Sequence, residues 1–154
     1  MIGLDFLQPR LVIAKELGAR LALNPKQDDV EAAIAGLTQG RGADLVIVAT
    51  ADSRVVGVAQ GLVRRGGRVL LFANTVPGEV IPVDASRICV EEKQLIGSYS
   101  SSVELQDKVA ELIFTRQIIV DGLISHRLPL DQFAEAIHIA SHPSENSLKV
   151  IMQP

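Results

Sequence analysis

Short uninterrupted apolar runs alternate with amphipathic stretches along the first hundred residues. Residues 1–4 are apolar and end abruptly at Asp5, which predicts a short buried strand with a carboxylate at its tip. Residues 44–49 show no polar alternation, the pattern of a strand covered on both faces of a sheet. Further strands are predicted at residues 21–23, 68–72 and 94–99.

Apolar residues at helical spacing separate these strands. The first helix is predicted to begin near Pro9, because a first turn does not need the missing N–H, and to stop at Gly18. The second is predicted over residues 29–38. The third has Ser53 as its candidate cap, and the glycines at 66–67 are predicted to end it.

Strands and helices in this order are typical of right-handed βαβ crossovers and a parallel sheet. The C-terminal part differs in character, and its elements are equally short. They are a helix after the capping box at 101–104, strands near 118–120 and at 124–128, a helix at 131–140 and a strand at 148–152. The sequence therefore predicts an α/β fold of one domain.

Composition narrows the classes of function. The 154 residues include 15 basic and 18 acidic side chains, without the basic patch that a nucleic-acid surface needs. The single cysteine, Cys89, excludes a disulfide framework and a cysteine-cluster metal site, and it is expected to pack as a small apolar side chain. With no signal-peptide pattern and no long apolar run, we expect a cytoplasmic protein without a membrane partner.

Asp5 is the most informative single residue. In a doubly wound sheet, an acidic side chain at the tip of the second strand accepts hydrogen bonds from the ribose of a dinucleotide. Such a carboxylate repels a 2′-phosphate and so favours NAD over NADP. Arg10 could stack on the adenine or pair with Asp5. The alternatives are a solvated turn residue and an exposed first-turn arginine.

The phosphate-binding loop that should accompany Asp5 is not found. A Gly-x-Gly-x-x-Gly turn should precede the strand that ends at Asp5, yet only four residues stand before it. The glycines at 40–42 and 66–67 follow predicted helices and precede predicted strands, which is the wrong order for a phosphate cradle. They are interpreted as helix C-caps.

Histidines and serines are weaker candidates for chemistry. His138 and His142 have the spacing of two ligands on one helical face, but no third ligand completes a metal site, and a helix-dipole role is the alternative. The serine cluster at 98–102 lacks a triad-like histidine and acid. Capping explains these serines, although their hydroxyls and amides could also face a ligand.

Several motifs in register resemble zinc-dependent medium-chain alcohol dehydrogenases, nearest to the sorbitol and threonine dehydrogenase branch. They are Asp5 with Arg10, the segments at 14–19, 24–26, 40–44 and 66–69, Gly97-Ser98-Tyr99, and the segments at 126–130 and 148–150. The resemblance implies an incomplete Rossmann-like, doubly wound and mostly parallel sheet over residues 1–120. Residues 121–154 would be a tail that returns to the catalytic domain of the complete enzyme.

The resemblance also implies how NAD would be held. Asp5 and Arg10 would bind the adenosine ribose. Residues that follow two of the buried strands would line the nicotinamide side. Residues at the end of a third strand would approach the nicotinamide ribose. These residues are Ala49 and Thr50, then Phe72, Ala73 and Asn74, and finally Ser98 and Tyr99. The edge strand at 94–98 would pair with its copy in a homo-oligomer.

Departures from the family pattern limit what this chain can do alone. The family's zinc ligands lie in a catalytic domain that has no counterpart here, so we assign the chain no catalytic and no metal-binding residue. The family's first strand, glycine loop and first helix are also missing. Because that strand is central, its two neighbours must either pair directly or receive a strand from another chain.

The preferred hypothesis is therefore the cofactor-binding portion of an NAD-dependent, zinc-type alcohol or polyol dehydrogenase, inactive alone. A non-enzymatic remnant that binds nucleotide or dimerises is the first alternative. A nucleoside-binding transferase such as a methyltransferase is the second, since those enzymes also place a carboxylate after the second strand. That alternative requires a glycine loop before the strand and a different final sheet edge.

Overall fold

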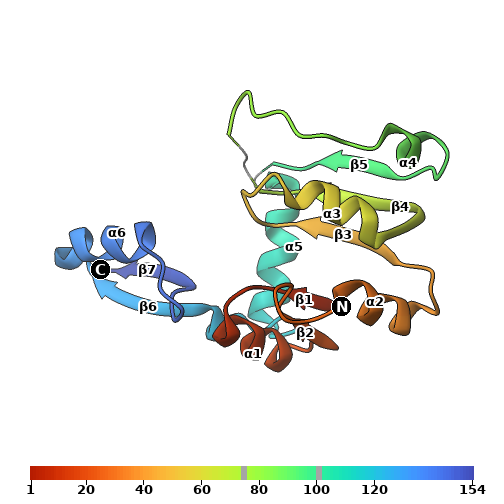
Figure 1. Ribbon diagram of the computed structural model, residues 1–154. Coiled ribbons are helices and arrows are strands. Elements are labelled where there is room, and N and C mark those ends of the chain that lie inside the picture. The colour runs from red at the N-terminus through yellow and green to blue at the C-terminus, as the bar shows by residue number, and fades with distance from the viewer. Residues whose placement is uncertain (74–75, 100–101) are drawn as a thin grey trace. The chain divides into compact units, whose positions relative to one another are not determined.

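The computed structural model describes residues 1–73, 76–99 and 102–154 (Figure 1). In chain order its elements are β1 (Ile2–Leu4), α1 (Gln8–Glu16), β2 (Leu21–Leu23), α2 (Val30–Thr38), β3 (Ala43–Val48), α3 (Val55–Leu62), β4 (Val63–Leu71), α4 (Ala85–Cys89), β5 (Gln94–Gly97), α5 (Val103–Phe114), the 3-10 turn η1 (Asp121–Leu123), β6 (Ile124–Pro129), the 3-10 turn η2 (Leu130–Gln132), α6 (Phe133–Ser141) and β7 (Lys149–Gln153). Every strand pairing is parallel, which confirms the α/β prediction. None of the described helices is both long and apolar enough to cross a membrane.

The chain divides into two compact units. The first combines residues 1–28 with 103–154, and the second comprises residues 29–102. The first unit holds two sheets of two strands each, β1-β2 and β6-β7. The second holds the three-stranded sheet β3-β4-β5.

The three-stranded sheet is packed against α3 (Figure 1). Neighbouring side chains along a strand point to opposite faces of a sheet. The buried core lies between the sheet and α3, where Val48, Val63 and Val69 of the strands meet Ala59 of the helix. On β3 the alternate residues Leu45 and Ile47 are 49% and 55% exposed. The prediction that residues 44–49 form a strand covered on both faces is therefore wrong for this structure, because only the face toward α3 is covered.

The glycines at 66–67 do not cap α3, contrary to the prediction. The helix ends at Leu62, because Val63 already has extended backbone and begins β4. Both glycines lie within β4, where the register against β3 shifts, and the amide of Gly66 donates to the carbonyl of Glu91 at 2.8 Å. A Cβ on Gly67 would lie 2.6 Å from Cγ2 of Val63, so close backbone packing explains this glycine.

The other predicted helix ends are largely confirmed. Gly18, at a φ of 93°, directly follows the cap residue of α1. At the end of α2 both Gln39 and Gly40 have positive φ, 56° and 78°, and the amide of Gly40 donates to the carbonyl of Ala35 at 2.8 Å. Cys89 at the end of α4 is exposed, so the expectation that it packs as an apolar side chain is wrong.

The first unit contains two βα pairs in which a helix contacts its sheet. Helix α1 contacts β1 and β2, and α6 contacts β6 and β7. Residues 118–120 do not form the predicted strand. The amide of Ile118 donates instead to the carbonyl of Leu112 at 3.1 Å, which satisfies the end of α5 rather than a sheet ladder.

The strand pairings concern the two strands that would neighbour the missing strand of the family pattern, β1 and β3. β1 pairs with β2, and β3 pairs with β4. Both expected outcomes, direct pairing of the two neighbours and a strand supplied by another chain, stay predictions.

Candidate cofactor-binding site

The carboxylate of Asp5 stands where β1 ends, as predicted. The amide of Asp5 donates to the carbonyl of Leu23 at 3.3 Å, which extends the pairing of β1 with β2 by one residue. Oδ1 accepts a hydrogen bond from the amide of Leu7 at 2.9 Å, and Oδ2 lies 3.6 Å from Nη1 of Arg10. The carboxylate is thus oriented from two sides while its side chain remains 31% exposed.

Arg10 is held in α1 between two partners. Besides its ion pair with Asp5, Nη2 donates to the carbonyl of Ser147 at 3.1 Å. Its Nε is buried and has no hydrogen-bond partner among the residues that the structure describes. Of the roles that the sequence suggested for Arg10, the structure shows the pairing with Asp5. The contact with Ser147, 137 residues away, has no sequence signal.

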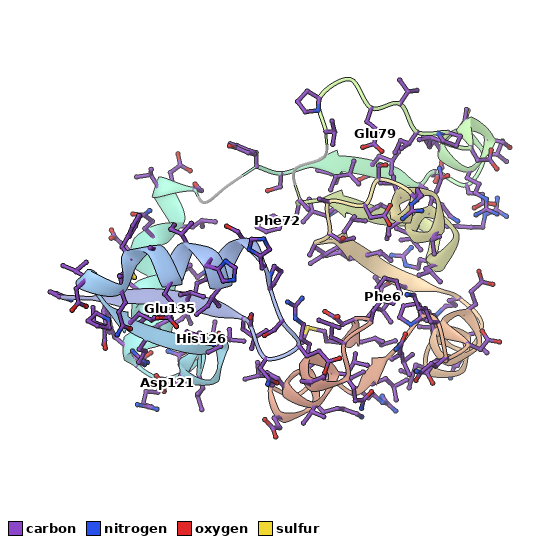
Figure 2. All side chains as sticks on the ribbon, turned by 60° about the vertical axis from the view of Figure 1, so that its left-hand side comes forward. Phe6, Phe72, Glu79, Asp121, His126 and Glu135 are labelled. Atoms are coloured by element: carbon purple, nitrogen blue, oxygen red, sulfur yellow. The ribbon has the colours of Figure 1, made fainter. Side chains whose placement is uncertain are left out.

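The sequence analysis assigned no role to three side chains that lie near the end of β1, namely Phe6, Asn24 and Lys26. Phe6 is 53% exposed (Figure 2), and the Nζ atom of Lys26 lies 4.7 Å from the centre of its ring. The buried Asn24 donates from Nδ2 to the carbonyl of Phe6 at 3.2 Å. The only available signals were the position of Phe6 after the carboxylate and the Asn24-Pro25 turn after the second predicted strand.

A second group of predicted residues gathers where β3 and β4 end. The amides of Phe72 and Ala73 both donate to the carbonyl of Val48, at 3.1 and 3.2 Å. This bifurcated pairing holds the chain leaving β4 against the end of β3, with Ala49 and Thr50 exposed beside it. Asn74, the last residue predicted here, lies outside the described residues.

A small cavity of about 90 Å³ opens at the same place. Its lining comes from β3, β4, α3 and the segments that leave the two strands: Val48, Thr50, Ser53, Val56, Leu71, Ala73, Glu79 and Ile81. Thr50 and Ala73, predicted from different parts of the chain, are therefore brought together. Ser53 makes no cap bond to α3, and its buried hydroxyl donates to Oε1 of Glu79 instead.

The turn between β3 and α3 is closed by an arginine and an aspartate. Nε and Nη2 of Arg54 each lie 2.8 Å from an oxygen of Asp52. The hydrogen bond from Arg54 holds the pKa of Asp52 below its usual value, and the same bond raises the pKa of Arg54. This turn therefore keeps a carboxylate ionised beside Thr50.

The last predicted pair follows β5. The amide of Ser98 donates to the carbonyl of Leu71 at 3.0 Å, so the parallel ladder continues one residue past β5. Tyr99 is 79% exposed. Thr50, Ala73 and Ser98 thus all lie at the carboxyl edge of one sheet, which is where open α/β sheets bind ligands.

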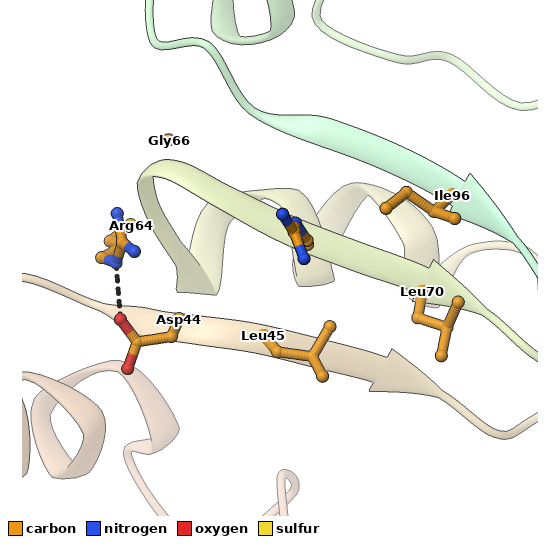
Figure 3. A pocket seen from close by; sticks show the side chains of 7 residues that line it. Asp44, Leu45, Arg64, Gly66, Leu70 and Ile96 are labelled. Carbon is orange, nitrogen blue, oxygen red and sulfur yellow. Dashed lines mark hydrogen bonds and ion pairs between the residues drawn. The ribbon is translucent and has the colours of Figure 1, made fainter.

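A larger hollow of about 510 Å³ lies on the open face of the sheet (Figure 3). It is lined by Asp44, Leu45, Arg64, Gly66, Arg68, Leu70 and Ile96. Nε of Arg64 lies 2.6 Å from Oδ1 of Asp44, and this hydrogen bond lowers the pKa of Asp44. The hollow contains none of the residues predicted to bind a cofactor.

The histidines do not assemble a metal site in the described part of the chain. The rings of His138 and His142 stack with their centres 4.6 Å apart, and Nδ1 of His142 lies 3.1 Å from the carbonyl of His138. No group of three histidine, cysteine, aspartate or glutamate side chains is placed to hold a metal ion among the described residues. The described residues therefore do not fit a zinc site.

Comparison with known proteins decides the family. Residues 1–115 match the family model of zinc-binding dehydrogenases, which is more than half of the chain. The chain belongs to the zinc-binding dehydrogenase family. The resemblance that was carried by Asp5, Arg10 and the downstream motifs is thereby confirmed.

Two relatives of this zinc-binding dehydrogenase chain are named as dehydrogenases of polyols. An erythritol/L-threitol dehydrogenase of Mycolicibacterium smegmatis is 29% identical over 160 residues, which cover 100% of this chain and 42% of that protein. A sorbitol dehydrogenase of Halalkalibacterium halodurans is 27% identical and is matched over 99% of this chain and 43% of its own length. The chain thus spans less than half the length of the curated relatives it matches.

A solved structure extends the likeness to three dimensions. A zinc-binding dehydrogenase of Sinorhizobium meliloti 1021, bound to NADP, matches with a TM-score of 0.88 and 28% sequence identity. The match covers 99% of this chain and 44% of that one. The Rossmann-like prediction is confirmed for this part of the family's structure.

Proposed function

We propose that this chain is the cofactor-binding part of an NAD-dependent, zinc-type dehydrogenase that oxidises an alcohol or polyol. One observation carries the proposal: the carboxylate of Asp5 at the carboxyl end of β1, oriented by the amide of Leu7 and by Arg10. Asp5 then accepts hydrogen bonds from the hydroxyls of the adenosine ribose. Its polyol-oxidising relatives support the substrate class.

Asp5 also supports a preference for NAD over NADP. A 2′-phosphate carries up to two negative charges and would stand against the carboxylate. Arg10 and Lys26 are the nearby cations, but Arg10 is already paired with Asp5 and Lys26 lies over Phe6. Neither is left to neutralise a phosphate without breaking its present contact. The relative from Sinorhizobium meliloti is bound to NADP, so the preference must be measured here.

The nicotinamide half of the cofactor is proposed to lie at the carboxyl edge of β3-β4-β5. Ala49, Thr50, Phe72 and Ala73 line this position, and Ser98 and Tyr99 approach the nicotinamide ribose. The small cavity beside Thr50 and Ala73 supports this placement. Bound NAD accepts a hydride from the substrate, and these residues orient its ring and exclude water from that face.

The chemistry at the substrate oxygen is assigned to a part of the enzyme outside this chain. In zinc-type dehydrogenases a metal ion polarises that oxygen, whereas the described residues offer no metal site. We divide the chain into a partial dinucleotide-binding domain at 1–120 and a tail at 121–154 that returns to the catalytic domain. The family match ending at residue 115 supports this boundary.

We also propose a cytoplasmic homo-oligomer. Strand β5 is the outer strand of its sheet, and its free edge is suited to pairing with the same strand of a second copy. The single cysteine in 154 residues agrees with a reducing compartment.

Titration of the purified chain with NADH, followed by the fluorescence of the reduced nicotinamide, tests the cofactor assignment. We expect saturable binding that is weak, because the backbone cradle for the pyrophosphate is missing. In Asp5→Ser the Kd for NADH should rise about 10-fold, as charge-assisted hydrogen bonds are lost. The Kd for NADPH should fall in the same variant, because the repulsion of the 2′-phosphate is removed.

Asp28→Ser is the matched control, since Asp28 is an aspartate of the same unit that caps the turn at Asn24. It should leave the ratio of NADH to NADPH affinity unchanged. Absence of binding by the parent chain would favour the alternative function, a dimerisation remnant without cofactor. An Asp5→Ser variant with unaltered NADH and NADPH affinities would remove Asp5 from the site.

A further inference from the structure

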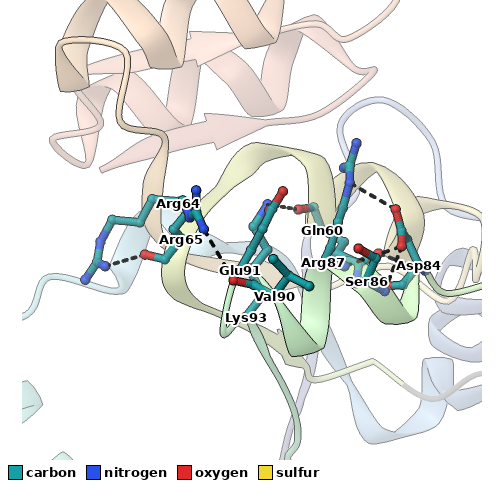
Figure 4. Close-up of polar contacts among 9 residues, drawn as sticks. All are labelled: Gln60, Arg64, Arg65, Asp84, Ser86, Arg87, Val90, Glu91 and Lys93. Carbon is teal, nitrogen blue, oxygen red and sulfur yellow. Dashed lines mark hydrogen bonds and ion pairs between the residues drawn. The ribbon is translucent and has the colours of Figure 1, made fainter.

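The segment that leaves β4 is fastened by side-chain hydrogen bonds at two points, once to the segment that leaves β3 and once to α3. Residues 49–54 lead from β3 into α3, and residues 76–84 lead from the β4 side toward α4. At one point the hydroxyl of Ser53 donates to the carboxylate of Glu79. At the other, the side-chain amide of Gln60 exchanges two hydrogen bonds with the backbone of Asp84, at 3.1 and 3.2 Å (Figure 4).

These two joints lie at opposite ends of α3. Gln60 is in the last turn of the helix, and its contact fastens the chain to the helix just before α4. Ser53 lies two residues before the helix, in the connection that also contains Thr50. The contact between Ser53 and Glu79 is therefore the one that reaches the small cavity, since both residues line it together with Thr50 and Ala73.

We propose that Ser53 and Glu79 form a positioning pair that sets the spacing of the two segments around the nicotinamide. This inference rests on the proposed function and adds two positioning residues to the proposed nicotinamide site. Neither residue is required to touch the cofactor. Their hydrogen bond holds residues 76–84 against the turn that contains Thr50. The surface that contacts the nicotinamide is therefore preorganised before the cofactor binds.

Local folding does not require this contact. Ser53 makes no cap bond to α3, although a serine before a helix is suited to that task. Its hydroxyl reaches 26 residues along the chain instead, and the serine is only 5% exposed. Glu79 is an exposed residue whose amide closes a local turn with the carbonyl of Val76 at 3.1 Å, so the segment keeps its own turn without the carboxylate.

The test compares two ligands on the complete chain. NADH contains the nicotinamide, whereas ADP-ribose contains everything up to the second ribose and lacks that ring. In Ser53→Ala and in Glu79→Ala, we expect the Kd for NADH to rise about 3- to 10-fold, the equivalent of one hydrogen bond. The Kd for ADP-ribose should change less than about twofold, within the spread of such a contact.

Two further variants separate a pair from two independent residues and a hydrogen bond from a charge. The double variant should bind NADH no more weakly than the worse single variant, because either substitution already breaks the joint. Glu79→Gln keeps an acceptor for Ser53 and should bind NADH like the parent chain. Because Glu79 is exposed, its substitutions do not depend on repacking of the interior and decide the question even if Ser53→Ala unfolds.

The outcomes distinguish this inference from the function on which it rests. If the parent chain binds neither NADH nor ADP-ribose, the proposed function fails and the positioning pair fails with it. If the parent chain binds both, and Glu79→Ala has unchanged affinity or weakens both ligands equally, only the positioning pair is overturned. Loss of NADH affinity in Glu79→Gln equal to that in Glu79→Ala would overturn it as well, because charge rather than the hydrogen bond would then be responsible.

Discussion

Lys93 is the one buried charged side chain among the residues that the structure describes, and it shows how a charge is accommodated in the interior. The side chain is 7% exposed, and its Nζ lies 2.7 Å from Oε2 of Glu91 and donates to the carbonyl of Gln60 at 3.0 Å (Figure 4). A buried ammonium needs both kinds of partner, since an unpaired charge is costly away from water. Lys93 thereby links the start of β5 to α3.

The partner of Lys93 gives a prediction about pH. The hydrogen bond from Lys93 lowers the pKa of Glu91 in the folded chain. The stabilisation is therefore complete above the unfolded pKa of about 4.3 and is lost as the pH falls through the lower folded value. The free energy of unfolding, measured with urea at several pH values, should fall less steeply in this acidic range for Glu91→Gln than for the parent chain.

Glu92 provides the comparison, because it is the exposed neighbour of Glu91. Glu92→Gln should preserve the acidic loss of stability. If the two variants have parallel stability curves, the bond between Lys93 and Glu91 does not contribute to the pH dependence.

At the scale of elements, β4 shows what local patterns miss. Two glycines after a helical stretch predict a cap, yet residues 66–67 lie inside a strand of nine residues. The local sequence cannot distinguish a cap glycine from a strand glycine here. Gly67 is required because its backbone packs closely against Val63 and against the carbonyls of Arg64 and Asp44. Apolar spacing nevertheless predicted the starts and ends of two other strands, β5 and β7, to within three residues. It succeeds there because the apolar pattern of a buried strand is a local property of the sequence.

Gly67→Ala should therefore destabilise the second unit. The added Cβ would lie 2.6 Å from Cγ2 of Val63 and 2.9 Å from the carbonyl oxygen of Arg64, so the backbone must shift. We expect the free energy of unfolding in urea to fall by about 1–3 kcal/mol. Gly57→Ala, in the middle of α3 with no atom near the new Cβ, should raise it by about 0.5–1 kcal/mol. Equal effects of the two substitutions would contradict the packing at Gly67.

The free edge of β5 gives the second prediction at this scale. The amide of Ser98 points to β4, so by alternation the amide of Gly97 points outward, toward a second copy in the proposed dimer. Gly97→Pro removes that donor without removing a bond to β4, and it should shift the chain from dimer to monomer in sedimentation equilibrium. Gly97→Ala, whose Cβ meets nothing within 4 Å, should remain dimeric. A parent chain that is monomeric at all concentrations would exclude this edge as an interface.

At the scale of the whole molecule, the residues proposed to bind the cofactor come from both units, and no metal site is found in either unit among the described residues. Asp5 and Arg10 belong to the first unit, and Thr50, Ala73 and Ser98 belong to the second. The proposed function thus assigns cofactor binding to this chain, which corresponds to less than half the length of its relatives.

We therefore expect the purified chain to oxidise no alcohol or polyol at a measurable rate, even with zinc and saturating NAD. Nothing in the described residues would hold the metal that polarises the substrate oxygen. The assay is the appearance of NADH absorbance with erythritol, threitol and sorbitol, with a complete sorbitol dehydrogenase as the positive control. Turnover that depends on zinc and is lost in Asp5→Ser would show that the chain carries its own active site.

The amino-acid sequence by itself determined the parallel α/β class, the carboxylate at the tip of the first strand and the family. These features depend on apolar periodicity and on short motifs, and both are local properties of the chain. Only the tertiary structure decided that Arg10 contacts Ser147, that Ser53 turns away from its helix to Glu79, and that Gly67 lies in a strand. Each of these depends on which distant atoms compete for one polar group or one small space, and no pattern of neighbouring residues records that competition.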